Sequence, residues 1–317
     1  MSPRAALTVA LARRFAAFAM SLAGATLLVQ VLLWAAPGDA VDLVTGDAEL
    51  RAGLIELWGL DRPLHEQWLR FVGHALQGDL GTSLTYRPGT EVSELVARAA
   101  WTSAPTLLLA LLLTVGCGVG LAYASAGRWR LPRRLVQALS VAPVFLLAAA
   151  SITGLNELTF ALMGSGWIDK PDWFALPIGD NLVKSALAVT ILAVGSSALS
   201  EVHASADEEL RRIRASGFVD AAQARGAPLW PHILWNLLPP MSTVVASRAA
   251  FFVGGLVVIE KVLQLNGAGA MLWQACRLRD YPLAMGLTVA AAAVVTGIRL
   301  LADVLRLGVD PRLRRRA

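Results

Sequence analysis

Residues 218–240 read FVDAAQARGAPLWPHILWNLLPP and lie between the apolar stretches 182–200 and 241–263. Unlike those stretches, they combine charged side chains with a glycine and four prolines. Glycine can take the left-handed conformation that ends a helix, and proline suits the first turn of the next one. The segment therefore predicts a short helix over 218–225, a tight turn at Gly226, and a second helix after that turn.

The end of this segment, Leu238-Pro239-Pro240, is expected to stop the second helix and turn the chain into the following apolar stretch. Proline has no amide hydrogen, and its ring collides with the carbonyl group four residues earlier. Two consecutive prolines therefore predict a helix boundary at this point.

The composition is typical of a protein that crosses a membrane several times. Of the 317 residues, 56% are hydrophobic and 16% are charged, and the mean hydropathy is +0.58. Soluble domains carry about 25% charged residues. The formal net charge is +5, but the arginines lie at the edges of apolar runs rather than on one basic face. This placement indicates membrane topology rather than a nucleic-acid partner.

Several segments are long and apolar enough to cross about 30 Å of hydrocarbon. The first has no obvious small-residue cleavage site of the kind that follows a signal peptide, so we expect it to remain as a membrane helix. An even number of spans places both termini on one side of the membrane. We predict an all-α polytopic protein with about six transmembrane helices, over residues 15–36, 101–125, 135–157, 182–200, 241–263 and 283–306.

Arginine placement indicates which side of the membrane is cytoplasmic, because positive residues concentrate in cytoplasmic loops. The short loops that carry only Lys170, or Arg277 and Arg279, are expected outside. Both termini and the loop 201–239 are therefore predicted to be cytoplasmic. The arginines on that side are Arg4, Arg13 and Arg14, then Arg128, Arg130, Arg133 and Arg134, and finally Arg306, Arg312, Arg314, Arg315 and Arg316.

The segment after the first span is amphipathic rather than disordered. Leu64, Trp68 and Val72 recur at helical spacing, and the run Gly59-Leu60-Asp61-Arg62-Pro63 predicts two short helices with a break between them. The chain thus divides into an N-terminal arm with the first span (1–36), an extracytoplasmic helical segment (37–100) and a core with the other spans (101–317), which includes the cytoplasmic loop 206–240.

Five motifs in order along the chain resemble one family of transport proteins. Asp220-Ala221-Ala222, Gly226 and Leu238-Pro239 are spaced like the EAA coupling loop of bacterial ABC importer permeases, with Asp220 where that loop usually begins with Glu. The chain resembles a permease subunit of the oligopeptide/dipeptide/nickel family, of the type encoded first of the pair. The other four motifs are Ala36-Pro37-Gly38-Asp39, GLDRPLHEQWLRFVGHALQGDLGTSL (59–84), VVIEKVLQLNGAGAMLWQACRLRDYPLAMGL (257–287) and Asp310-Pro311-Arg312.

The resemblance implies a function and a set of partners. The chain would pair with a second, similar permease, two ATP-binding subunits and an extracytoplasmic solute-binding protein in the bacterial inner membrane. It would form the pathway for peptides, nickel or another small solute, with the type I ABC importer permease fold, contact with membrane lipid and no cofactor. The residues expected to dock on the ATPase are Asp220, Ala221, Ala222, Arg225, Gly226, Leu238 and Pro239, with the two alanines keeping the helix slim for close approach.

Polar residues inside apolar spans are candidates for the transport pathway, because a central charge costs about 2.5–3.5 kcal/mol there. The candidates are Arg248 and Glu260 in the fifth span, and Asn156 and Glu157 at the outer end of the third. The four histidines show no metal-ligand spacing, and no phosphate-binding loop or catalytic set of side chains is present. We therefore expect neither a bound metal nor a catalytic site.

An ion-coupled secondary transporter acting alone is the alternative function, and an integral membrane enzyme is a third. A secondary transporter predicts carboxylates at the membrane midplane and internal repeats with broken helices. The sequence shows no convincing repeat, and such a transporter leaves the charged loop 206–240 without a role. A membrane enzyme needs a convergent catalytic set, which the sequence lacks.

Overall fold

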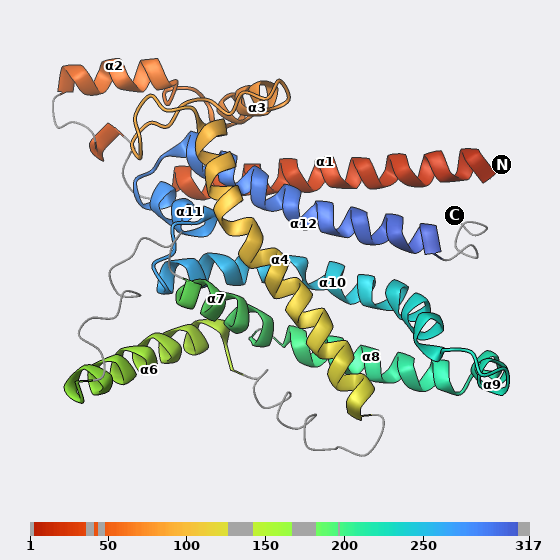
Figure 1. Ribbon diagram of the computed structural model, residues 1–317. Helices are drawn as coiled ribbons and strands as arrows, with labels where there is room; N and C mark the ends of the chain where they lie inside the picture. Colours follow the sequence, from red (N-terminus) through yellow and green to blue (C-terminus); the bar gives the residue numbers. More distant parts are fainter. Residues whose placement is uncertain are drawn as a thin grey trace. The chain divides into compact units, whose positions relative to one another are not determined.

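Helices make up the regular structure in the computed structural model, which describes residues 3–35, 41–43, 48–125, 142–166, 182–195 and 197–309. Within these ranges an isolated bridge joins Thr82 to Glu91. Figure 1 labels the elements: α1 Pro3–Ala35, the 3-10 helix η1 Val41–Leu43, α2 Ala48–Trp58, α3 Leu64–Ala75, α4 Val92–Ser125, α6 Val144–Gly164, α7 Leu182–Val194, α8 Ala198–Arg214, α9 Gly217–Ala224, α10 Leu229–Val262, α11 Ala268–Arg277 and α12 Tyr281–Val309.

In the described part of the chain, five helices are long and apolar enough to cross a membrane, and the bent pair α7–α8 makes a sixth if it counts as one span. The five spans lie within α1, α4, α6, α10 and α12. In hydrocarbon every backbone amide and carbonyl must be bonded within the protein, and a helix achieves this along its length. The predicted all-α polytopic fold with about six spans is confirmed.

Two predicted spans differ from the helices that form. The third, expected over 135–157, is α6, which continues to Gly164; residues 126–141 lie outside the described part of the chain. The fourth, expected over 182–200, ends with α7 at Val194, and α8 follows after a bend of 52°. Ser197 between them has a φ of 59°, a left-handed conformation that interrupts the helical hydrogen-bond pattern.

The end of α7 is supported by its neighbours. Thr114 Oγ1 of α4 lies 2.7 Å from the carbonyl oxygen of Ala110 and 3.3 Å from that of Ala193, so it supplies a hydrogen bond where α7 stops. A Cβ atom at Gly195 would come within 2.8 Å of Val144 Cγ2. Glycine is therefore required at this bend because α6 packs directly against it.

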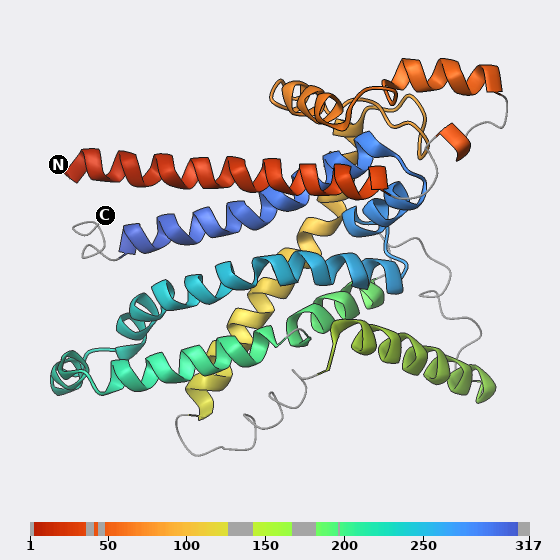
Figure 2. The ribbon, with the colours of Figure 1, turned by 180° about the vertical axis from the view of Figure 1, so that it is seen from behind.

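The predicted helix boundary at Leu238-Pro239-Pro240 is wrong, because α10 runs unbroken through both prolines. Leu237 and Met241, on either side of them, are buried with side chains of α8, and this packing holds the helix across the missing amide hydrogen bonds. Ser242 Oγ donates to the Pro239 carbonyl oxygen at 2.7 Å. Figures 1 and 2 show α10 bent towards its α9 end, as expected where prolines remove hydrogen bonds.

The chain divides into two compact units. Unit 1 contains residues 1–12, 105–265 and 297–317, and unit 2 contains residues 13–104 and 266–296. Unit 1 has two buried apolar clusters, one mainly on α4, α6, α7 and α10 and the other on α4, α8, α9 and α10. Unit 2 has one, on α1, α4, α11 and α12.

In unit 1, α8 and α10 pack along each other, with α9 at the end of the pair (Figure 2). Helix α4 comes so close to α8 that a Cβ atom at Gly118 would lie 2.5 Å from Val202 Cγ1. Glu201 of α8 forms an ion pair with Arg248 of α10, whose guanidinium carbon lies 5.0 Å from the centroid of the Phe251 ring. The ion pair joins α8 to α10 beside the α7–α8 bend.

In unit 2, a buried carboxylate fixes a long connection to the start of α12. Asp280 is fully buried, and its Oδ2 accepts hydrogen bonds from the Ser83 hydroxyl at 2.5 Å and from the backbone amides of residues 84–86 at 3.0–3.1 Å. Its Oδ1 accepts the Leu283 amide at 3.2 Å and so caps the first turn of α12. Burying a charge is costly unless it is hydrogen-bonded, and these donors meet that requirement.

The amphipathic segment after the first span forms the two short helices predicted for it, α2 and α3, which are separated at Gly59, where φ is 66°. Side-chain hydrogen bonds join α3 to α1. Trp68 Nε1 donates to Thr26 Oγ1 at 3.1 Å, and Gln30 Nε2 donates to Gln67 Oε1 at 3.0 Å. The segment is therefore held against the first membrane helix rather than projecting freely.

Replacing Asp280 with asparagine should loosen the segment 82–91. The amide has no negative charge, and its NH2 group cannot accept the hydrogen bonds that now converge on Oδ2. We expect the amides of residues 84–86 to exchange with solvent at least about tenfold faster, as measured by hydrogen-exchange mass spectrometry. Asp61→Asn, at an exposed position, is the control and should leave this exchange unchanged. Unaltered exchange in Asp280→Asn would contradict the anchoring role.

Glu201→Gln should destabilise unit 1 more than the double variant Glu201→Gln/Arg248→Met does. The single change leaves a guanidinium whose side chain is only 21% exposed without its carboxylate, whereas the double change removes both charges. An unpaired, partly buried charge of this kind costs about 1–3 kcal/mol. The apparent melting temperature of the purified protein in detergent should therefore fall in the single variant and recover in the double. Strictly additive losses would show that the two groups are not coupled.

Candidate functional site

Helix α9 is held between two defined turns at the end of the α8–α10 pair. Ser216 precedes it in an extended conformation, and the Val219 amide donates to the Ser216 carbonyl oxygen at 3.0 Å. After it, Gly226 has a φ of 66°, its amide donates to the Gln223 carbonyl oxygen at 2.9 Å, and the next amide donates to the Ala222 carbonyl oxygen at 3.0 Å. This is the Schellman arrangement, and it confirms the turn predicted at Gly226.

One face of α9 is buried in unit 1. Val219 and Ala222 are 3% and 2% exposed, and Val219 belongs to the same apolar cluster as Leu210 and Ile213 of α8 and Leu237 of α10. Because an eight-residue helix is not stable alone, this burial is what keeps α9 helical. The helix is thus fixed to both α8 and α10.

The rest of the α9 surface is exposed and chemically mixed. Phe218 is 42% exposed, although its ring is large and apolar. Asp220, Ala221 and Arg225 are also exposed, and Arg225 Nε donates to the Ala221 carbonyl oxygen at 3.0 Å. A short helix that exposes an aromatic ring together with acidic and basic side chains has a composition suited to a protein interface.

The structure places the predicted docking residues on three different surfaces. Asp220, Ala221, Arg225 and Gly226 lie together on the exposed face of α9 and the turn after it. Ala222 is buried, so its side chain is not presented to a partner. Leu238 and Pro239 are half-buried within α10 and do not form the end of a helix.

Phe218 is an exposed residue of α9 that reasoning from the sequence did not single out. Val219 and Ala222 are three apart and share one side of the helix, and Phe218, one turn before Ala222, lies at the edge of that side. A large apolar residue that stays exposed at such an edge is a candidate for a contact surface.

The structure does not bring the predicted pathway residues together. Asn156 is half-buried and Glu157 is exposed on α6, short of the end of that helix. Arg248 is engaged by Glu201. Glu260 is 2% exposed near the end of α10, where its carbonyl oxygen accepts the Leu265 amide at 2.7 Å. Their role in a pathway stays a prediction.

No group of three or more histidine, cysteine, aspartate or glutamate side chains among the described residues is placed to hold a metal ion. The side chains that α9 exposes are an apolar ring and two charged groups, on a helix held in a fixed orientation by its turns.

Comparison with known proteins identifies the family. Residues 95–315, which include α8, α9 and α10, match the family described as binding-protein-dependent transport system inner membrane component. A Brucella ovis protein with the provisional name of peptide permease is 33% identical over 311 residues, covering 91% of this chain and 93% of that protein.

Two further relatives are similar over the same length. The glutathione transport system permease protein of Salmonella paratyphi A is 29% identical, with 90% of this chain and 92% of that protein covered. The oligopeptide transport system permease protein of Bacillus subtilis is 29% identical, with 92% and 95% covered. This chain therefore belongs to the family of binding-protein-dependent transport system inner membrane components, as a multi-pass membrane protein and a translocation subunit.

Proposed function

We propose that this protein is a permease subunit of an ABC importer for peptides, and that α9 is the element through which ATP-hydrolysing subunits drive it. The observation that carries the proposal is the construction of α9, which is packed against α8 and α10 through the buried Val219 and leaves Phe218, Asp220 and Arg225 exposed. The peptide cargo is supported by the relatives, whose names describe peptide, glutathione and oligopeptide transport.

Docking would follow the helix-in-groove mode of recognition, in which a short helix inserts a few anchors into a complementary groove. The Phe218 ring is the anchor, since aromatic side chains carry much of the binding free energy at interfaces. Asp220 and Arg225, which are exposed elsewhere on the same short segment, would supply polar contacts that fix the orientation of the helix in the groove. Ala221 leaves room for close approach on the same face.

Force would pass from α9 into the membrane through rigid contacts. Binding of ATP closes a pair of ATPase subunits, and a helix docked on them must follow that movement. The Gly226 turn and the burial of Val219 and Ala222 prevent α9 from moving independently of α8 and α10. Both long helices would therefore shift with it as one body, which opens or closes a pathway between permeases.

The assembly that fits this function has four kinds of component besides lipid. They are this permease, a second and similar permease, two ATP-binding subunits, and an extracytoplasmic solute-binding protein near the segment 37–100. The family description, which names dependence on a binding protein, supports the last of these. The arginine distribution supports cytoplasmic termini and a cytoplasmic α9 in the bacterial inner membrane.

Gly226→Pro should uncouple peptide uptake from ATP hydrolysis without preventing membrane insertion. Proline cannot adopt a φ of 66° and has no amide hydrogen for the Gln223 carbonyl, so the turn that fixes α9 is lost. We expect uptake into vesicles containing the whole importer to fall about tenfold or more while the amount of protein in the membrane is unchanged. Gly217→Ala is the control, because nothing lies within 4 Å of its Cβ position. Normal uptake by Gly226→Pro would refute the coupling role of α9.

Phe218→Ala should weaken binding of the ATP-hydrolysing subunits about tenfold or more, because truncating an anchor residue removes most of its buried contact area. Co-purification from membranes and the affinity for the isolated ATPase subunits are the measurements. Phe160→Ala removes an exposed ring from α6 and should change neither. If both variants retain their ATPase subunits equally well, Phe218 is not the anchor. If the unmodified protein copurifies with no ATPase subunit, the proposed function itself fails.

A further inference from the structure

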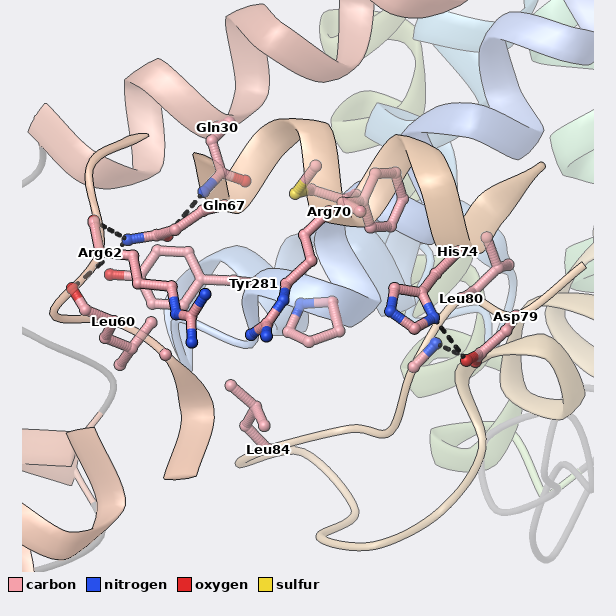
Figure 3. Close-up of a pocket in the computed structure, with 15 residues that line it drawn as sticks. Gln30, Leu60, Arg62, Gln67, Arg70, His74, Asp79, Leu80, Leu84 and Tyr281 are labelled. Atoms are coloured by element: carbon pink, nitrogen blue, oxygen red, sulfur yellow. Dashed lines mark hydrogen bonds and ion pairs between the residues drawn. The ribbon is translucent and has the colours of Figure 1, made fainter. Parts of the chain in front are cut away.

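Unit 2 contains a half-open pocket of about 240 Å³ that the proposed function leaves unassigned. Its walls come from α1, α3, the turn before α3, the connection after α3, and the first turns of α12, and Figure 3 shows the lining side chains. The apolar part of the lining consists of Leu60, Phe71, Leu80, Leu84, Pro282 and Met285. The polar part includes two arginines, Arg62 and Arg70.

The two guanidinium groups converge on one point. A Cβ atom at Gly59 would lie 3.4 Å from Arg70 Nη1 and 3.7 Å from Arg62 Nε, so both groups surround the space that the glycine leaves open. Figure 3 shows both pointing into the pocket near the ring of Tyr281. Gly59 is needed here because its φ is 66° and because a side chain would occupy that space.

Among the described residues, neither the Arg62 side chain nor the Arg70 side chain has a hydrogen-bond or ion-pair partner. The two guanidinium groups therefore have no counter-ion within this part of the chain. Asp79 is the one carboxylate in the lining. Its Oδ2 lies 3.2 Å from His74 Nδ1, and its Oδ1 accepts the Gly81 amide at 2.8 Å. Two positive charges in one small pocket repel each other, and an anion placed between them removes that repulsion.

The pocket lies close to the membrane surface. Gln30 lines it and is five residues from Ala35, where the first span ends, so it is about 8 Å below the end of that helix. Trp68 of α3 bonds to Thr26, still deeper in the same span. Leu69 of α3 and Leu76, directly after that helix, are 59% and 84% exposed. Such exposed apolar side chains suit a helix that lies in the lipid interface.

We propose that this pocket binds the headgroup of an anionic phospholipid. Arg62 and Arg70 would hold the phosphate oxygens through charge-assisted hydrogen bonds, for which the planar guanidinium is well matched. The glycerol backbone and the first carbons of an acyl chain would contact the apolar lining. Such a lipid would join α3 to α1 and α12 at the membrane face where α1 ends, in addition to the side-chain hydrogen bonds already present.

Native mass spectrometry of the full-length protein in detergent tests this directly, with palmitoyl-oleoyl phosphatidylglycerol as the probe and phosphatidylcholine with the same acyl chains as the comparison. We expect phosphatidylglycerol to bind about tenfold more tightly, and Arg62→Gln/Arg70→Gln to abolish that preference while phosphatidylcholine binding is unchanged. Arg87→Gln is the matched control, because Arg87 is exposed in the same unit but does not line the pocket. It should retain the preference.

Three outcomes would overturn the proposal. One is equal binding of the two lipids to the unmodified protein, and another is a preference that survives Arg62→Gln/Arg70→Gln. The third is displacement of phosphatidylglycerol by millimolar inorganic phosphate, which would show that the site takes a free anion. If the double variant keeps its lipid preference and instead loses capture of a solute-binding protein, the arginines serve a protein interface. The lipid-binding results are measured without transport and do not bear on the proposed function, whereas capture of the solute-binding protein is a separate measurement that tests one of its proposed partners.

Discussion

Hydrocarbon offers no hydrogen-bond partner to a backbone amide or carbonyl, and this constraint explains most of the architecture. It requires long helices wherever the chain crosses the membrane, and it requires a substitute wherever a helix is interrupted. At the end of α7 the substitute is the hydroxyl of Thr114. The interruption at the end of α7 is thus accompanied by a polar side chain from the same unit.

The same requirement appears at the buried charges. Asp280 accepts hydrogen bonds from the connection between α3 and α4, and Arg248 of α10 forms an ion pair with Glu201 of α8. Each of these charged groups therefore connects segments that are distant in the sequence. The two units therefore use paired or hydrogen-bonded charges to fix the positions of elements, in addition to apolar packing.

Local sequence was a good guide where one residue decides the backbone. Gly226 ends α9 because only its conformation allows the turn, and Gly59 separates α2 from α3 for the same reason. The apolar runs also predicted the membrane helices, and the order of five motifs predicted the family that comparison then showed. The glycine turns, the apolar runs and the order of the motifs are properties of the linear sequence, so they can be predicted from one sequence.

The sequence was a poor guide where packing decides. Pro239 and Pro240 have a low helix propensity, yet burial of the residues around them against α8 outweighs it. The bend after Val194 depends on Ser197 and on the close contact of Gly195 with α6, which no local pattern shows. Likewise, the burial of Val219 and Ala222 depends on how α9 packs in unit 1, so the burial of Ala222 could not be read from its motif.

The bend between α7 and α8 has a mechanical consequence. Helix α8 has 17 residues, so at 1.5 Å per residue it is a lever about 25 Å long, with the bend at one end and α9 at the other. A tilt of about 5° at the fulcrum displaces the far end by about 2 Å, by the same geometry. Glu201 lies in the first turn of α8, next to the bend, so the same tilt would displace it much less than it displaces α9. In this arrangement α8 would convert a larger displacement at α9 into a smaller displacement near the bend.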